Sequence, residues 1–249
     1  MHPTTLHNRA LVRVGGVEAR AFLQGLLTQD VLGLMGGAPR YAGLLSPQGK
    51  ALFDMILWED PAKPEDVLID CEATRADTLI RRLTLYRLRR PVSVTPEPEL
   101  AVHWSAEPTE GAATDPRLSA LGWRWLAPAN PADASADFFH IRVKHGVAEG
   151  VEELGEDKIL WLETNAQELH GVDYQKGCYI GQENTARMHY RNKVNRRLVV
   201  VPLDKSDPAR QRCAWPELGL ALDHRPVDSL GGITLPDWLA AAIAAEPAA

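Results

Sequence analysis

The stretch Lys176-Gly177-Cys178-Tyr179-Ile180-Gly181-Gln182-Glu183 is the densest chemical signal in the sequence. Two glycines bracket Cys178 and let the backbone turn tightly or approach a ligand closely. The amine of Lys176 favours the thiolate form of Cys178, and Gln182 and Glu183 are able to hydrogen-bond the polar edge of a heterocycle. The residues alone leave a second interpretation open, in which a glycine turn carries a buried, unreactive cysteine beside a solvated basic face.

Basic residues gather in and after this stretch. From Lys176 to Arg197 there are six basic residues and one acid, so the segment carries +5 and leaves −11 on the rest of a chain whose net charge is −6. A second basic cluster precedes Pro91 and consists of Arg81, Arg82, Arg87, Arg89 and Arg90. The acidic total argues against a protein that coats nucleic acid. Two basic islands on an acidic chain predict a local site for an anion.

Composition places the 249 residues among globular proteins, because 45% are hydrophobic and 24% are charged. The sequence has no window of eighteen uninterrupted apolar residues, so we expect no membrane span and no membrane partner. The first residues lack the basic and apolar regions of a secretory signal. Cys71, Cys178 and Cys213 form no CxxC, which argues against a disulfide framework or a structural zinc site. We therefore expect a reduced, cytoplasmic protein without a tightly bound metal.

The apolar periodicity predicts strands and helices that are mixed without a regular βαβ rhythm. Ser46-Pro47-Gln48-Gly49-Lys50 is a turn sequence between two apolar runs, which predicts a β-hairpin over 41–58. Thr74 and Asp77 are spaced as an N-cap pair for a helix that runs to about Arg87. Further strands are expected over 9–14, 67–71, 100–104, 123–126 and 198–203, and helices over 17–27, over 136–144 and from Asp237 onward. The predicted fold class is therefore α+β.

The segment from Lys176 to Glu183, followed by Ala186-Arg187 and an arginine-rich run, resembles the KGCYxGQE signature of the YgfZ-type folate-binding family. These proteins are similar to the aminomethyltransferase, or T-protein, of glycine cleavage. Weaker similarity covers most of the chain, at Phe22-Leu23-Gln24-Gly25, at the hairpin turn and over 165–169. The resemblance implies a T-protein-like ring of domains, with a tetrahydrofolate pocket near the middle and a small C-terminal β-barrel. It also implies a role in assembly or repair of iron–sulfur enzymes, including one that modifies tRNA.

The resemblance also implies how the chain is divided and which residues act. We expect an α+β folate-binding region over 1–95, a second α+β region with the motif over 96–195, and a barrel-like region with a terminal helix over 196–249. Cys178 is the implied catalytic thiol. The residues expected to bind folate are Lys176, Gly177, Tyr179, Gly181, Gln182, Glu183, Arg187 and Asp54. The implied partners are a reduced folate and iron–sulfur client enzymes or assembly factors, with tRNA contacted only indirectly.

The sequence departs from true aminomethyltransferases where their catalysis uses a carboxylate. Those enzymes carry paired aspartates on the strand after the glycine turn, and this chain has Phe53-Asp54 there. An aromatic ring cannot hold or relay a proton. Cys71 and Lys144 likewise stand where the family has an asparagine and a glutamate that contact folate. Glycine cleavage is therefore disfavoured, and the question of enzyme activity stays open.

Three alternatives remain for the basic, cysteine-containing segment. One is an aminomethyltransferase-like one-carbon transferase that uses tetrahydrofolate. Another is an RNA-binding accessory factor, with phosphate contacts from the basic residues of 187–197, although binding of a folate tail needs only two or three such cations. A hydrolase that pairs Cys178 with His145, His170 or His189 is the weakest alternative, because the sequence places none of these imidazoles near the sulfur.

Overall fold

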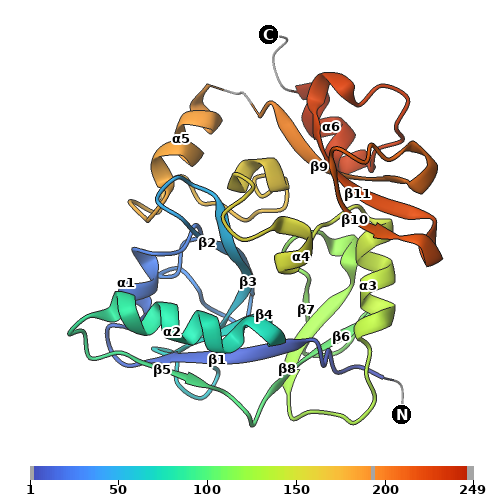
Figure 1. Cartoon of the computed structure of the whole chain (residues 1–249). Coiled ribbons are helices and arrows are strands. Elements are labelled where there is room, and N and C mark those ends of the chain that lie inside the picture. The colour runs from blue at the N-terminus through green and yellow to red at the C-terminus, as the bar shows by residue number, and fades with distance from the viewer. Residues whose placement is uncertain (1–2, 192–193, 246–249) are drawn as a thin grey trace.

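The structure is a computed structural model that describes residues 3–191 and 194–245 (Figure 1). Its largest sheet is antiparallel, with the strand order β2-β3-β4-β1-β5. The strands are β1 (Arg9–Gly15), β2 (Arg40–Leu45), β3 (Ala51–Glu59), β4 (Val67–Glu72) and β5 (Ser93–Pro96). The predicted hairpin is confirmed, since β2 pairs with β3 and Gly43 lies opposite Asp54.

Both faces of this sheet are covered, which explains why eight of the nine residues of β3 are buried. Two helices, α1 (Ala19–Gln24) and α2 (Ala76–Arg87), bury Phe22 and Leu83 in the core on one face. The other face contributes to a second core that continues into the rest of the molecule and includes Trp161. A continuous apolar strand is the pattern expected for a sheet that has no solvent face.

A second, smaller sheet has the order β6-β8-β7. Its strands are β6 (Ala101–Ser105), β7 (Ala113–Thr114) and β8 (Trp123–Ala127), and they are followed by α3 (Ser135–Lys144) and α4 (Gly150–Leu154). Helices and strands thus alternate irregularly among antiparallel sheets, and the α+β prediction is confirmed. The region boundaries expected near residues 95 and 195 stay a prediction.

The C-terminal part contains a third antiparallel sheet, of order β10-β11-β9. Its strands are β9 (Arg196–Pro202), β10 (Gln211–Trp215) and β11 (Leu220–Pro226), and the remaining helices are α5 (Gln182–Tyr190) and α6 (Asp237–Ala245). Leu239 of α6 packs into a core with Val199 and Val201 of β9. Within the described residues this part is an open sheet covered by a helix, and not the β-barrel implied by the resemblance, because three strands are too few to close a barrel.

The beginning of α2 corrects one local prediction. Thr74 does not cap the helix: it lies in a 3₁₀ turn over 73–75, and its hydroxyl donates to Glu72 Oε1 at 2.6 Å. No side chain caps the first turn of α2. The carboxylate of Glu72 is a stronger acceptor for the Thr74 hydroxyl than a neutral group would be, so the expected pairing with Asp77 does not form.

Candidate functional site

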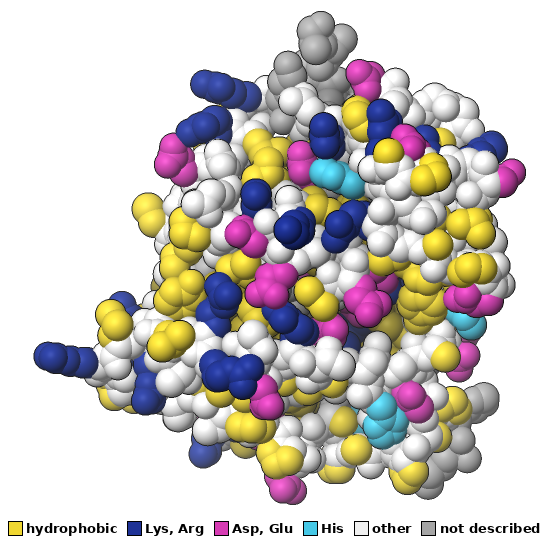
Figure 2. All heavy atoms as spheres, viewed as in Figure 1, with side chains coloured by type: hydrophobic (Ala, Val, Ile, Leu, Met, Phe, Trp, Pro, Cys, Tyr) yellow, Lys and Arg dark blue, Asp and Glu magenta, His cyan; other side chains and the backbone are white. Residues whose placement is uncertain are grey.

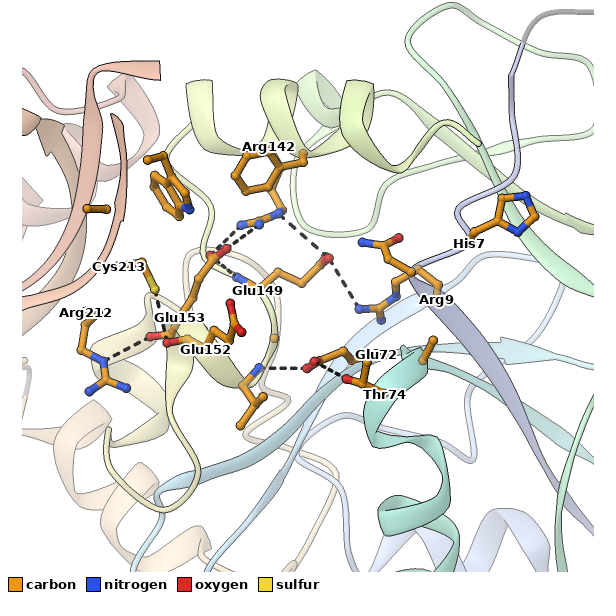
Figure 3. Close-up of a pocket in the computed structure, with 17 residues that line it drawn as sticks. His7, Arg9, Glu72, Thr74, Arg142, Glu149, Glu152, Glu153, Arg212 and Cys213 are labelled. Carbon is orange, nitrogen blue, oxygen red and sulfur yellow. Dashed lines mark hydrogen bonds and ion pairs between the residues drawn. The ribbon is translucent and has the colours of Figure 1, made fainter. Parts of the chain in front are cut away.

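A hollow of about 830 Å³ opens in the middle of the molecule, where parts of all three sheet regions meet (Figure 3). The first sheet contributes residues at the start of β1 and the end of β4, α3 and α4 contribute from the second region, and β10 contributes from the third. Its charged lining residues include Arg9, Glu72, Arg142, Glu149, Glu153 and Arg212. We call this space the central hollow.

A chain of buried ion pairs runs from the central hollow into the protein. Arg9 of β1 donates from Nε to Asp70 of β4 at 2.6 Å, and Arg124 of β8 contacts the other oxygen of Asp70 at 3.1 Å. Asp115 accepts from Arg124 at 2.7 Å and from Arg117 at 2.8 Å. Burial opposes ionisation of Asp115, but Arg117 and Arg124 outweigh it and lower the pKa of Asp115 to about 2. The network therefore joins the first two sheets through buried groups of opposite charge.

Glu149 connects this network to the wall of the central hollow. Its carboxylate accepts from Arg117 at 2.5 Å and lies 3.5 Å from Nη1 of Arg9. Arg142 of α3 lies 4.0 Å from Glu149 and makes bonds of 2.6 and 2.7 Å to Glu153 of α4. Burial acts to raise the pKa of Glu149, but Arg9, Arg117 and Arg142 hold that pKa well below its usual range. Glu149 is therefore ionised and fully engaged by the surrounding guanidinium groups.

Asp54 is the one sequence-predicted site residue that lies against the central hollow. It is 6% exposed on β3, and its Oδ1 accepts from the backbone N–H of Gly150, which lines the hollow, at 3.2 Å. Burial raises the pKa of Asp54 to about 6, against the opposing effect of Arg9, and the charge of Glu149 adds to the rise. A carboxyl group with this pKa is able to hold or release a proton near neutral pH.

Phe53, the residue before it, faces the opposite side of the sheet. Its ring lies under the guanidinium groups of Arg75 and Arg82, at 5.0 and 6.0 Å from the ring centroid. Successive residues of a strand point to opposite faces, so Asp54 lies on the face of the sheet that contacts Gly150, and Phe53 lies on the other face. A carboxylate at position 53 would therefore lie on the face of the sheet away from the hollow, so the phenylalanine there does not change the charge of the hollow.

The motif segment lies elsewhere and packs against α1. Nε2 of Gln24 donates to the carbonyl oxygen of Lys176 at 2.9 Å, and Nζ of Lys176 donates back to the carbonyl oxygen of Gln24. The same ammonium lies 4.8 Å from the centroid of the Tyr179 ring. Burial lowers the pKa of Lys176 to about 8, although the charges of Asp30, Asp173 and Cys178 oppose the shift. Lys176 thus attaches the loop before Cys178 to the first helix.

Glycine is required at the two glycine positions of the motif for different structural reasons. Gly177 has φ = +95°, and a side chain there would meet nothing within 4 Å, so only its backbone conformation requires glycine. Gly181 has φ = +84°, and a β-carbon there would lie 2.5 Å from the carbonyl oxygen of Ser46 and 2.9 Å from Cβ of Leu45. The hairpin turn therefore packs directly on the start of α5 through Gly181.

The remaining motif residues form one side of a shallow groove of about 780 Å³, which Pro47 and Tyr190 also line. Gln182 accepts from the backbone N–H of Tyr179 at 3.2 Å, and Tyr179 is buried. Glu183 and Arg187 form an ion pair of 2.6 Å on the exposed face of α5. These side chains stabilise the turn and the helix, which is a structural role that the sequence did not indicate.

The structure therefore separates the residues that the sequence assigned to one folate site. Neither Lys176 nor any other predicted residue of the motif is among the residues that line the central hollow, whereas Asp54 lies against it. The hairpin turn and α1 hold the motif in its own place, and the assignment of these residues to one folate site stays a prediction. The two sites have to be considered separately.

The three cysteines differ in their environments. Cys178 is exposed, Cys213 is partly buried beside the central hollow, and Cys71 is buried in β4. Burial raises the pKa of Cys71 to about 12 and that of Cys213 to about 11. Both remain protonated near neutral pH, and a thiol reacts poorly without ionisation. Among the three, Cys178 is the one that a large partner is able to reach.

The basic segment after the motif is partly neutralised by its own surroundings. Arg197 is 1% exposed and pairs with Glu168 at 2.8 Å, and Arg187 pairs with Glu183 on the surface. Lys193, which was counted in this segment, lies outside the described residues. The sequence therefore overstated the positive charge that is available here for an anion.

Sequence reasoning missed the buried network around the central hollow. A usable signal was present, because Arg9, Asp70 and Arg124 lie within apolar strand segments. Charged side chains are almost never fully buried unless they are paired, so three of them on predicted strands indicate buried ion pairs. Glu149 and Arg117 lie in connecting segments, and no periodicity marks them.

Two further searches concern metals and membranes. In the described parts of the chain, no three His, Cys, Asp or Glu side chains come together as a group able to hold a metal ion. The helices of these same parts include none that is both long and apolar enough to cross a membrane.

Comparison with solved structures confirms the T-protein-like fold. The chain aligns with the glycine cleavage system aminomethyltransferase T from Bartonella henselae at a TM-score of 0.64, over 90% of this chain and 78% of that one. The sequence identity is 15%, so this likeness concerns the fold alone. No protein-family model matches the chain.

Curated relatives are much closer in sequence, and three of them are named iron–sulfur cluster assembly factor IBA57 or its homologue. The mouse protein is 36% identical in an alignment 241 positions long, which covers 82% of this chain and 67% of that protein. The human protein is 36% identical in an alignment 231 positions long, which covers 79% of this chain and 65% of that protein. The homologue from Coccidioides immitis is 31% identical, and the match covers 82% of this chain and 57% of the homologue.

These comparisons also correct one prediction and identify the family. The names of the three relatives contain the word mitochondrial, and this overturns the expectation of a cytoplasmic protein. That expectation was based on the cysteine pattern, which indicates a reducing environment and not a particular compartment. The chain spans about two thirds of the length of the two mammalian relatives and just over half of the fungal one. The predicted resemblance is confirmed, and the chain belongs to the IBA57 family of iron–sulfur cluster assembly factors.

Proposed function

We propose that this protein assists the assembly or repair of iron–sulfur clusters on client enzymes, and that Cys178 is the thiol that contacts the cluster or the client. Family membership supports the general role. The observation that carries the assignment to Cys178 is its exposure on a loop that α1 holds in place, while the other two cysteines are buried or partly buried. Thiolates are the usual protein ligands of iron–sulfur clusters.

A substitution of Cys178 tests this role. Cys178→Ser should abolish rescue of a [4Fe–4S] enzyme's activity in cells that lack their own factor of this family. The same change should leave the melting temperature of the purified protein within about 1 °C, because an exposed side chain contributes little to stability. Cys71→Ala is the matched control, because Cys71 lies in β4 and does not line the hollow, and it should rescue normally. Full rescue by Cys178→Ser would contradict the proposed role of this thiol.

We further propose that a reduced folate binds in the central hollow, apart from Cys178. The volume of about 830 Å³ lies within the range of small-molecule sites. Phe139 and Trp215 line it with their rings edge to face at 5.6 Å, which offers an apolar wall for a flat heterocycle. Arg212 also lines the hollow, and the only bond its guanidinium donates within the described chain is one of 3.4 Å to the carbonyl oxygen of Glu153. Arg212 is therefore suited to a carboxylate of the folate tail.

The residues of the hollow therefore fit the cofactor that the fold family implies. Bound tetrahydrofolate would supply a reduced ring that acts as a one-carbon acceptor or an electron donor. The residues of this chain would bind and orient it: aromatic side chains against the ring, Arg212 near the tail, and Asp54 as the group that exchanges a proton at the floor of the hollow. The motif residues from Gly177 to Arg187 would not take part in this binding.

Folate binding is tested directly with tetrahydrofolate. A ligand that binds only the folded state raises the melting temperature, so saturating tetrahydrofolate should give a positive shift. Arg212→Met should weaken binding roughly tenfold, the loss expected for one charge-assisted contact. Arg187→Met is the matched control, since this arginine lies in the motif groove, and it should bind folate as the unchanged protein does. Absence of any shift would contradict a folate site in the hollow, while leaving the proposal for Cys178 intact.

A second candidate function is one-carbon transfer to tetrahydrofolate, which the raised pKa of Asp54 in the hollow favours. Formation of methylene-tetrahydrofolate and ammonia from an aminomethyl donor by the purified protein, lost in Asp54→Asn, would support it. The RNA-binding alternative has less support, because the basic segment is partly ion-paired within the chain. A client enzyme that modifies tRNA stays a prediction, and we propose that such a role is indirect.

A further inference from the structure

The end of α2 carries apolar side chains on its outer surface. Leu79 and Leu83 face the core, whereas Leu85 is 75% exposed and Leu88, the residue after the helix, is 84% exposed. Val17, in the turn before α1, is 87% exposed. These are three of the six large hydrophobic side chains most exposed in the described parts of the chain. The protein therefore presents aliphatic groups to water at a position where its own core does not need them.

Two contacts place Val17 beside the end of α2. Arg90 forms an ion pair with Glu18 at 3.9 Å. Gly16 packs so closely on Pro91 that a β-carbon on the glycine would lie 2.6 Å from the carbonyl oxygen of Pro91. The turn at 16–18 and the segment 85–91 therefore form one corner of the molecule, which we call the α2 corner.

The backbone conformation at residue 88 is energetically unfavourable for leucine. Its φ is +52° and its ψ is −112°, a conformation that side chains with a β-carbon rarely adopt. Glycine would relieve the strain, and 84% exposure means that leucine gains little from burial. Neither the local conformation nor the packing of the fold accounts for leucine at this position. Strain of this kind persists where a side chain has a function.

The same corner and the turn of α2 before it are positively charged on an acidic protein. Residues 81–91 contain five arginines and no acid, whereas the chain as a whole has a net charge of −6. Arg82 and Arg90 pair with Glu156 and Glu18, at 3.7 and 3.9 Å. Within the described residues, Arg81 and Arg89 have no acidic partner, and Arg87 donates to the carbonyl oxygen of Val92. Dark-blue and yellow side chains project together at the left corner of the space-filling view, over the end of α2 (Figure 2). Cations and aliphatic groups thus share one projecting surface.

We propose that the α2 corner binds the surface of an anionic lipid membrane. Two interactions hold a peripheral protein on such a surface. Aliphatic groups insert at the interface, and arginines pair with lipid phosphates. The corner projects and none of its residues lines the central hollow or the motif groove, so it suits a flat surface better than a peptide, which needs a groove. This proposal revises the expectation of no membrane partner, which rested only on the lack of a spanning segment.

Vesicle sedimentation with the full chain tests the proposal. The protein should sediment with vesicles that contain about 30% phosphatidylglycerol at low salt, and not with vesicles of phosphatidylcholine alone. Binding should fall at least tenfold in about 0.5 M NaCl, where surface charges are screened. Absence of binding to the anionic vesicles would overturn the proposal. The same result is expected if the corner binds an acidic protein and not a membrane.

Leu88→Gly separates a binding role from a structural one. Glycine relieves the strained backbone, so this variant should melt roughly 2–4 °C higher than the unchanged protein while binding anionic vesicles several-fold more weakly. Leu85→Ser should weaken binding similarly with little change in melting temperature. Tyr190→Ser is the matched control, because Tyr190 is 74% exposed on α5, and it should bind normally. Equal binding by all three variants would overturn the assignment to this corner.

Discussion

In the central network, Arg117 is buried between Asp115 and Glu149, with a side chain that is 1% exposed. On α5, Arg187 pairs with Glu183 at a similar distance, but the two side chains are 50% and 84% exposed. The central network joins strands and loops that are far apart in the sequence. The surface pair joins residues four apart on one helix. Equal ion-pair distances therefore have different consequences, because solvent screens only the second pair.

The same contrast separates the two proposed activities. The central hollow has walls held by buried charges, which suits a small ligand that needs fixed partners. The Cys178 loop is exposed and attached by a few bonds to α1, which suits contact with a large partner. The motif that dominates the sequence therefore marks the exposed site, and the hollow with the organised charge has no compact motif.

The largest effect is expected from breaking the central network. Arg117→Met removes the cation that bridges two buried carboxylates, Asp115 and Glu149, and should lower the free energy of unfolding by about 3–5 kcal/mol. Arg187→Met should lower it by less than about 0.5 kcal/mol, as is usual for exposed pairs. Urea unfolding followed by circular dichroism measures both. If the two variants lost equal stability, the distinction between the two regions would fail.

A smaller effect is expected within the motif itself. Gly181→Ala forces a β-carbon against Ser46 and should cost about 2–4 kcal/mol, from the contact and the positive φ together. Gly177→Ala has the positive φ but no contact, and about 1 kcal/mol is expected. Thermal unfolding of the two variants gives the comparison. A Gly177→Ala variant as unstable as Gly181→Ala would show that the loop before Cys178 is more constrained than the structure indicates.

The last effect is a gain in stability at Asp54 that depends on pH. Its pKa is raised to about 6 in the folded protein, so the protonated carboxyl favours folding below pH 4 and that contribution is lost as the pH rises through 6. Asp54→Asn removes the ionisation and should be more stable than the unchanged protein by up to about 3 kcal/mol at pH 7.5. The difference should disappear at pH 4. A stability difference independent of pH would contradict the raised pKa.

Much of the fold could be predicted from local patterns. The apolar runs on both sides of 46–50 predicted the hairpin, because a turn sequence between two such runs has few other solutions. The N-cap at Thr74 was wrong, because the neighbouring Glu72 takes its hydroxyl. The strand β10 was missed, since its residues are only partly buried and lack a clear alternation.

The residues of the candidate sites could also be predicted only in part from the sequence. Cys178 and its flanking glycines were found because unusual residues stand next to one another in the chain. The wall of the central hollow was not found, because its residues come from distant parts of the chain and Glu149 and Arg212 each resemble an ordinary surface residue in the sequence. Asp54 was found only through the resemblance to a family.

The sequence by itself determined the family, the α+β class, the hairpin and the presence of one distinctive cysteine, because these depend on neighbouring residues and on periodicity. Only the tertiary structure decided that the motif lies outside the lining of the central hollow, and that the arginines of the centre are neutralised by carboxylates from other elements. The physical reason is that burial and pairing set the charge and reach of a side chain, and both depend on contacts between residues far apart in the chain.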